Sequence, residues 1–159
     1  MFNRDVSLRA EEGEEVPAKE WDLSAISPLS PQSQVMNLDA TLARFGGDRR
    51  FLTEMARLFL NEDCPRLMAE ISRAIAIGDA TSLAVAAHSL QNWIGNFSAP
   101  WVFEVVRVLE EMGRSGKLDR VEAAHEALQC GIARITAELV EFAGCADPGV
   151  DSHVPAPRK

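Results

Sequence analysis

His88 is the residue whose type and position best fit a chemical role in this sequence. It lies in the middle of a helix predicted over residues 80–97. On a helical wheel it falls about 140° from Leu83, which belongs to the apolar stripe of that helix. The imidazole is therefore predicted to be exposed. A neutral imidazole held rigidly in solvent is a competent nucleophile near neutral pH, so we take His88 as the candidate catalytic residue.

The wheel predicts a bare surface around His88, formed by Ala84, Gln91, Asn92 and Gly95. All four are small or polar, and none is charged. Glycine costs about 1 kcal/mol relative to alanine inside a helix, so Gly95 indicates a place where another backbone can approach closely. These features favour a docking surface. The alternative is a solvated histidine without a function.

The other histidines and the cysteines form no recognisable reactive group. His125 falls at the edge of an apolar stripe and is predicted to be structural, while His153 lies near the end of the chain. Cys64, Cys130 and Cys145 are odd in number and lack C-x-x-C spacing, which favours inert thiols over a disulfide framework. We therefore expect no bound metal. The sequence also lacks a nucleophile triad and a glycine-rich phosphate loop.

The elements that would position His88 are all helices. Between residues 38 and 144 the apolar residues recur at spacings of three and four, and nothing alternates at the strand period. Such spacing predicts an all-α fold, an antiparallel four-helix bundle with a short extra N-terminal helix. The predicted helices cover residues 38–45, a segment from 48 to 78, 80–97, a segment from 100 to 113 and a segment from 119 to 144.

Residues that start, stop or break helices set these boundaries. Aspartates are predicted to cap three helices, glycines to end them, and one proline to kink or split the long segment. The caps are Asp48, Asp79 and Asp119; the stops are Gly78, Gly113 with Gly116, and Gly144; the proline is Pro65. The predicted core stripe of the His88 helix comprises Leu83, Ala87, Leu90, Ile94 and Phe97.

Composition narrows the functional classes. The 159 residues carry 24 acidic and 16 basic side chains, a formal charge of −8, and 47% are hydrophobic. An acidic chain without a basic run is not expected to bind nucleic acid by neutralising phosphates. The uncharged window 80–103 is too polar for a membrane span, and no secretory signal opens the chain. We expect a cytoplasmic protein that does not enter a membrane.

Two tails are predicted to flank the bundle. Residues 1–37 form an acidic tail with Ser-Pro pairs, predicted to be disordered, and residues 145–159 form a second disordered tail. The cluster Trp21–Ile26 is the apolar part of the first tail. It could dock on this domain or on a partner, or belong to a merely tethered tail.

The run AAHSLQNWIGNFSA at residues 86–99 resembles the phosphoacceptor helix of histidine phosphotransfer (HPt) domains. That family's motif is approximately A-H-x-L-K-G, followed by a later G-A. Separated segments upstream and downstream agree in order and spacing, among them FGGD at 45–48 and LEEMGR at 109–114. The resemblance covers about residues 38–144.

The resemblance implies a function in two-component phosphorelays. His88 would accept a phosphoryl group from, and return it to, an aspartate of a response-regulator receiver domain, or exchange it with a histidine kinase. Gln91 would stabilise the phosphoryl group, and Ala84, Asn92 and Gly95 would dock the partner. Such a phosphocarrier is not an enzyme by itself and needs no cofactor of its own, because the partner receiver supplies the aspartate and Mg²⁺. We expect it to be a monomer.

The sequence departs from the family pattern beside the histidine. Gln91 stands where the family usually has lysine, and Asn92 where it usually has glycine. A glutamine donates only a neutral hydrogen bond, about half as strong as a charge-assisted one. An alternative is therefore an HPt-like binding module that docks on, or sequesters, a receiver domain or kinase without phosphotransfer.

Overall fold

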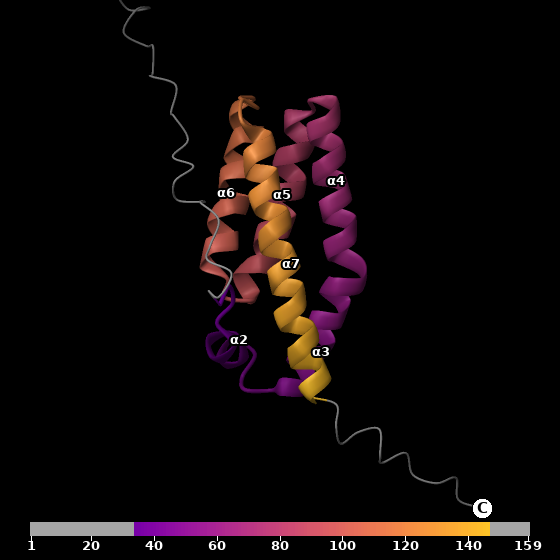
Figure 1. The fold of residues 1–159 in the computed structure, drawn as a ribbon, viewed down its shortest axis with the longest axis vertical. Helices are drawn as coiled ribbons and strands as arrows, with labels where there is room; N and C mark the ends of the chain where they lie inside the picture. The colour runs from indigo at the N-terminus through magenta and orange to yellow at the C-terminus, as the bar shows by residue number, and fades with distance from the viewer. Residues whose placement is uncertain (1–33, 147–159) are drawn as a thin grey trace, which may run out of the picture.

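The computed structural model describes residues 34–146, and helices are the only regular secondary structure among them (Figure 1). The all-α class predicted from the sequence is therefore confirmed for this part of the chain. The elements are α2 (Leu38–Arg44), α3 (Arg49–Leu58), the π-helical segment η2 (Phe59–Asp63), α4 (Cys64–Ile77), α5 (Ala80–Asn96), α6 (Pro100–Ser115) and α7 (Val121–Ala146).

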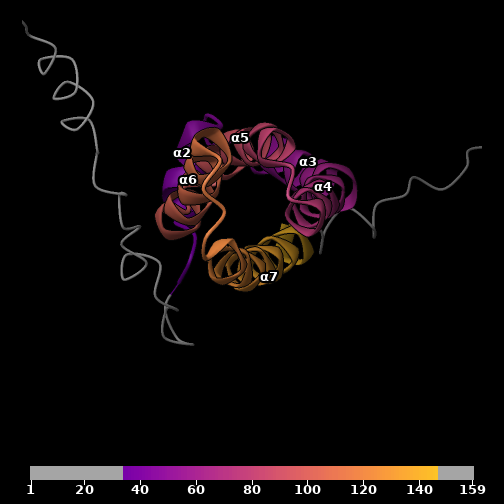
Figure 2. The same cartoon turned by 90° about the horizontal axis from the view of Figure 1, so that it is seen from above.

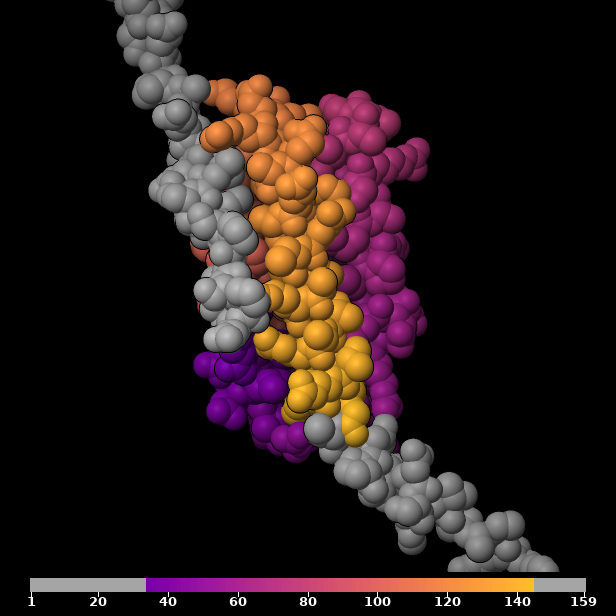
Figure 3. Space-filling model, in the orientation of Figure 1, coloured from indigo at the N-terminus to yellow at the C-terminus, as the bar shows by residue number. Residues whose placement is uncertain are grey.

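The long helices stand side by side around a common centre (Figure 2). α5 packs against both α4 and α6, and α7 packs against α6 and α3. The short helix α2 lies at one end of the molecule (Figure 1). α7 runs along the face seen in Figure 3, beside α4. The helix that carries His88 therefore has a neighbour on each side, which holds it in place.

Local sequence signals explain where most helices begin and end. Asp48 accepts a hydrogen bond from the Phe51 N–H at 3.0 Å and caps α3, and Asp79 caps α5 in the same way. Gly78 ends α4 with φ of 71°, a left-handed conformation that glycine adopts without steric cost. Pro100 occupies the first turn of α6, where its missing N–H costs nothing.

Three predicted boundaries are wrong. α6 continues through Gly113 to Ser115 and ends at Gly116, the second glycine of the predicted stop and turn, and α7 continues through Gly144 to Ala146. Gly113 is required for packing: a Cβ there would lie 2.6 Å from the backbone nitrogen of Ala84 on α5. At the start of α7, Arg120 with φ of 71° precedes the first helical residue, where Asp119 was predicted to cap.

The predicted break at Pro65 is present as a π-helical segment. The proline ring collides with the carbonyl four residues earlier and has no N–H to donate, so a regular α-helix cannot pass through it. The chain widens into η2 immediately before α4, and Pro65 lies in the first turn of α4. α3, η2 and α4 together thus replace one long helix.

The predicted core stripe of α5 is confirmed, since all five of its residues are fully buried. In α3 the large apolar side chains of Phe51 and Leu58 are exposed, whereas Leu52 and Ala56 are buried. Phe51 packs its ring edge-on against Phe45 of the preceding loop.

The packed part of the chain begins before Leu38. Val35 and Met36, which the sequence assigns to the tail, are buried in the core. The carboxylate of Glu138 on α7 accepts their backbone N–H groups at 2.9 and 3.1 Å. At the end of α5, the Thr41 hydroxyl donates to the Phe97 carbonyl at 2.7 Å and fixes α2 to that helix.

Some sequence predictions lie outside the described residues. These are the cluster Trp21–Ile26, His153 and most of both predicted tails. No helix within residues 34–146 is both long and apolar enough to cross a lipid bilayer.

Candidate functional site: an exposed histidine paired with a buried carboxylate

His88 lies in the middle of α5 with its side chain 54% exposed, so its predicted exposure is confirmed. The preceding and following turns of the helix are held by the buried stripe that includes Leu83 and Leu90. The backbone under the imidazole is therefore rigid, while the ring itself is open to solvent.

The imidazole has a hydrogen-bond partner that the sequence did not predict, the side chain of Glu110. Its Nδ1 lies 3.0 Å from Oε1 of Glu110 on α6. The Glu110 side chain is only 8% exposed. Carboxylates are rarely buried without a partner, so this contact is one that the buried group needs. The prediction of an uncharged surface around His88 is therefore wrong. Residues 80–103 contain no charged residue, but the neighbouring helix α6 places the carboxylate of Glu110 beside the ring.

Arg114 completes a three-residue chain. Its Nη2 lies 2.6 Å from the same Oε1 of Glu110 that contacts His88. Arg114 is one helical turn beyond Glu110 on α6, and its side chain is 62% exposed. The buried carboxylate therefore sits between a cation and an imidazole, and both of these partners reach solvent.

This geometry assigns the two ring nitrogens of His88. A carboxylate can only accept a hydrogen bond, so Nδ1 must carry the proton that Glu110 receives. In the neutral imidazole, Nε2 then holds the lone pair and faces away from the carboxylate. The contact with Glu110 thus holds the ring through Nδ1, and the lone pair lies on Nε2 of a ring that is largely exposed.

The other predicted site residues lie on the same side of α5 but differ in exposure. Asn92 is exposed, whereas Ala84, Gln91 and Gly95 are half-buried. Ala84 contributes its backbone to the close contact with Gly113 of α6, so it has a packing role. The structure therefore brings these residues onto one face with His88, and it leaves Asn92 the most accessible of them.

Gly95 borders a surface hollow of about 430 Å³ between α2, α5 and α6. A Cβ on Gly95 would lie 3.6 Å from the ring of Phe103, which is an ordinary van der Waals contact. Internal packing thus does not require glycine here. The hollow therefore borders α5 two helical turns from His88, where Gly95 has no side chain.

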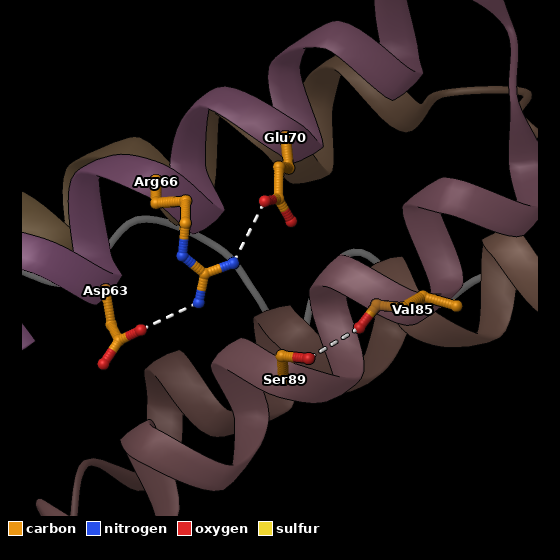
Figure 4. A network of polar contacts seen from close by, with 5 residues as sticks. All are labelled: Asp63, Arg66, Glu70, Val85 and Ser89. Atoms are coloured by element: carbon orange, nitrogen blue, oxygen red, sulfur yellow. Dashed lines mark hydrogen bonds and ion pairs between the residues drawn. The ribbon is translucent and has the colours of Figure 1, made fainter.

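A separate polar network occupies the α4 side (Figure 4). Arg66 pairs with Asp63 at 2.8 Å and with Glu70 at 3.0 Å, which ties η2 to α4. On α5, the Ser89 hydroxyl donates to the Val85 carbonyl at 3.1 Å. The hydroxyl of Ser89, the residue next to His88, is thus hydrogen-bonded within its own helix.

His125 on α7 fits the structural role predicted for it. Its Nε2 lies 3.0 Å from the Ser72 hydroxyl on α4, and the pair is partly buried. Burial lowers the pKa of His125 from its ordinary 6.5, and the nearby Glu122 and Glu126 oppose that shift. The histidine is used to join two helices.

The described cysteines do not form a redox or metal site. Burial raises the pKa of the Cys64 thiol to about 11, so this thiol stays protonated at neutral pH. Cys130 is exposed and unpaired, and the Cys145 side chain lies outside the described residues. Among the side chains of residues 34–144, His, Cys, Asp and Glu form no group of three or more that could hold a metal ion.

One sequence signal could have revealed Glu110. On the wheel of α6 it falls about 40° from Val106, at the edge of the core stripe, and a carboxylate at that position needs a partner. Arg114 follows at the i+4 spacing that favours an ion pair. The contact with His88 could not be read in this way, because it depends on how α5 and α6 pack.

The fold and the site together define an all-helical protein that displays a histidine oriented by a buried carboxylate. Comparison with known proteins gives no match to this chain among protein-family models, curated proteins or solved structures.

Proposed function

We propose that this protein is a histidine phosphotransfer protein of a two-component phosphorelay, with His88 as the phosphoacceptor. The observation that carries the proposal is the exposed imidazole whose Nδ1 is bonded to the buried Glu110. The resemblance of residues 38–144 to HPt domains supports it, and so does the all-helical fold. On this proposal the helices form an antiparallel four-helix bundle of the HPt type with α2 as the extra helix.

The transfer step follows from the assignment of the ring nitrogens. The lone pair of His88 Nε2 forms the N–P bond while the P–O bond to the receiver aspartate breaks. The aspartate carboxylate leaves with the electron pair. Phosphoryl transfer depends mainly on in-line positioning and charge stabilisation, so a rigid helix that presents one nitrogen serves the reaction well.

Glu110 acts as a positioning residue in this step. The proton on Nδ1 stays on the ring, and bond formation at Nε2 makes the ring cationic. The adjacent carboxylate stabilises that charge and holds the ring plane in place. Because Glu110 is nearly buried, its own movement is restricted, and the imidazole is pre-organised before the partner arrives.

The partner on this proposal is a receiver domain, a histidine kinase or both. The receiver supplies the phosphorylated aspartate and holds Mg²⁺, and this chain needs no cofactor. Ala84, Asn92 and Gly95 contribute the docking face, and the hollow beside Gly95 gives room for a side chain of the partner. The protein is a cytoplasmic monomer and not an enzyme by itself.

The test is a phosphotransfer assay with labelled receiver domains or kinases of the source organism. The wild-type chain should acquire acid-labile, base-stable label, and His88→Gln should acquire none. His125→Gln is the matched control, since it removes a histidine from another helix, and it should be labelled like the wild type.

The alternative is an HPt-like module that binds a receiver or kinase without phosphotransfer. Gln91 and Asn92 favour it, because the usual lysine and glycine are missing beside His88. Partner binding that survives His88→Ala, with no label on the wild-type chain, would select this alternative and overturn the phosphotransfer proposal.

A further inference from the structure

The proposed reaction places a doubly charged phosphoryl group next to α5, a helix that carries no charged residue. Gln91 occupies the position where a cation is expected, and it offers only a neutral N–H donor. A group that neutralises the phosphoryl charge must therefore come from another element. The described contacts of His88 indicate which one.

Arg114 is the cation joined to His88 through a single shared atom. Its Nη2 and the His88 Nδ1 both contact Oε1 of Glu110, at 2.6 and 3.0 Å. The guanidinium and the imidazole are therefore no farther apart than these two short contacts placed end to end. Arginine has five N–H donors in a fixed fork, so it can keep a bond to Glu110 and still offer donors to a phosphoryl oxygen.

The exposure of Arg114 and Glu110 agrees with such a role. The Arg114 side chain is 62% exposed, whereas that of Glu110 is 8% exposed. The carboxylate therefore fixes one end of the guanidinium, and the rest of the group remains accessible on the side of the molecule where His88 is exposed. Other arginines form pairs elsewhere: Arg107 bonds to Glu104, and Arg66 bonds to Asp63 and Glu70.

We infer that Arg114 binds the phosphoryl group on His88 Nε2 and supplies, from α6, the positive charge that Gln91 does not supply from α5. The inference rests on the proposed function, since it concerns the phosphorylated form of the same histidine. In the resting state Arg114 neutralises Glu110, and after transfer its free donors face the phosphoryl oxygens.

The experiment uses phosphoramidate, a small anionic phosphoryl donor, so that no partner protein is needed. The N–P bond to His88 forms as the N–P bond of the donor breaks, and ammonia leaves. Phosphorylation of Arg114→Gln should be about three- to ten-fold slower than that of the wild type, because a charge-assisted contact is lost in the transition state. Arg114→Lys should keep most of the rate.

A rescue variant separates charge from structure. Gln91→Lys introduced into Arg114→Gln should restore most of the lost rate, because it returns a cation from the other helix. Arg107→Gln is the matched control, since it removes another exposed, ion-paired arginine of α6 and should phosphorylate at the wild-type rate. Circular dichroism of all variants identifies any that fail to fold.

A ³¹P NMR titration gives a second readout that a merely structural residue would not change. The nearby guanidinium favours the doubly charged phosphoryl group, so the pKa of that group should rise in Arg114→Gln. A folded Arg114→Gln with the wild-type rate and the wild-type phosphoryl pKa would overturn the inference alone. If no form of the chain is phosphorylated on His88, by phosphoramidate or by any partner, the proposed function fails as well.

Discussion

The structure describes two histidines, His88 in the middle of α5 and His125 in the second turn of α7, and each has a partner on another helix at 3.0 Å. His88 uses Nδ1 to contact a buried carboxylate, and its ring is exposed. His125 uses Nε2 to contact the Ser72 hydroxyl, and it is half-buried. Both contacts join two helices, α5 to α6 for His88 and α7 to α4 for His125, but only the His88 ring is largely exposed. On the proposed function, the occupied nitrogen and the burial distinguish the reactive His88 from the structural His125.

Removing each histidine in turn should give the largest difference between the two sites. His88→Gln should abolish phosphorylation by phosphoramidate and leave the free energy of unfolding within about 0.5 kcal/mol of the wild type, as for most surface changes. His125→Gln should keep phosphorylation and lose about 1 kcal/mol of stability with its buried hydrogen bond. Labelling and urea denaturation measure the two effects. Equal loss of label in both variants would contradict the distinction.

The spacing between α5 and α6 holds His88 beside Glu110, and Gly113 sets that spacing. Gly113→Ala should lower the free energy of unfolding by about 3 kcal/mol, because its Cβ would meet the rigid backbone of Ala84 at 2.6 Å. Gly95→Ala is the matched control on α5. Its Cβ has room, so it should raise stability by up to about 1 kcal/mol through helix propensity. Thermal or urea unfolding gives both values, and a neutral Gly113→Ala would show that the helices can separate without cost.

Glu110 is the feature that makes the surroundings of His88 differ from those of His125. Glu110→Gln should slow phosphorylation of His88 about ten-fold, because the neutral amide stabilises the cationic ring less than a carboxylate does. Glu111→Gln, the adjacent carboxylate on α6, is the matched control and should retain the rate. Rates measured with phosphoramidate test this, and ¹H–¹⁵N NMR of the imidazole reports which nitrogen carries the proton. An unchanged rate together with an unchanged tautomer would remove Glu110 from the mechanism.

The smallest expected effect is the pH dependence caused by His125. Burial lowers the pKa of this residue below the ordinary 6.5, so the unfolded chain binds its proton more readily than the folded chain. The stability contribution is therefore complete above pH 6.5 and decreases as the pH falls from there through the lowered pKa. Urea unfolding of the wild type and of His125→Gln over this range should show a smaller decrease for the variant. Parallel curves would exclude His125 as the cause.

The sequence was sufficient for features that depend on local chemistry. Helix periodicity predicted the all-α class and the buried stripe of α5, and capping chemistry predicted Asp48 and Asp79. The sequence did not predict the contacts between helices. Gly113 has the sequence pattern of a helix end, but it is a site of close packing inside α6.

The candidate site shows the same limit. The wheel placed His88 on the exposed side of α5, because exposure follows from the position of the apolar stripe. It could not supply Glu110 and Arg114, which follow His88 by 22 and 26 positions along the chain. Their contact depends on the rotation and axial position of α6 against α5. Those are set by the packing of many side chains together.

The hydrogen bonds from Val35 and Met36 to Glu138 limit how far the chain can be shortened from its N-terminal side and still fold stably. A fragment that starts at Leu38, the first residue of the predicted bundle, would remove two buried side chains and leave the Glu138 carboxylate without its two backbone donors. Both hydrogen bonds join the segment before α2 to α7. The smallest fragment that folds stably is therefore expected to include Val35 and Met36. This short segment before α2 is part of the folded domain.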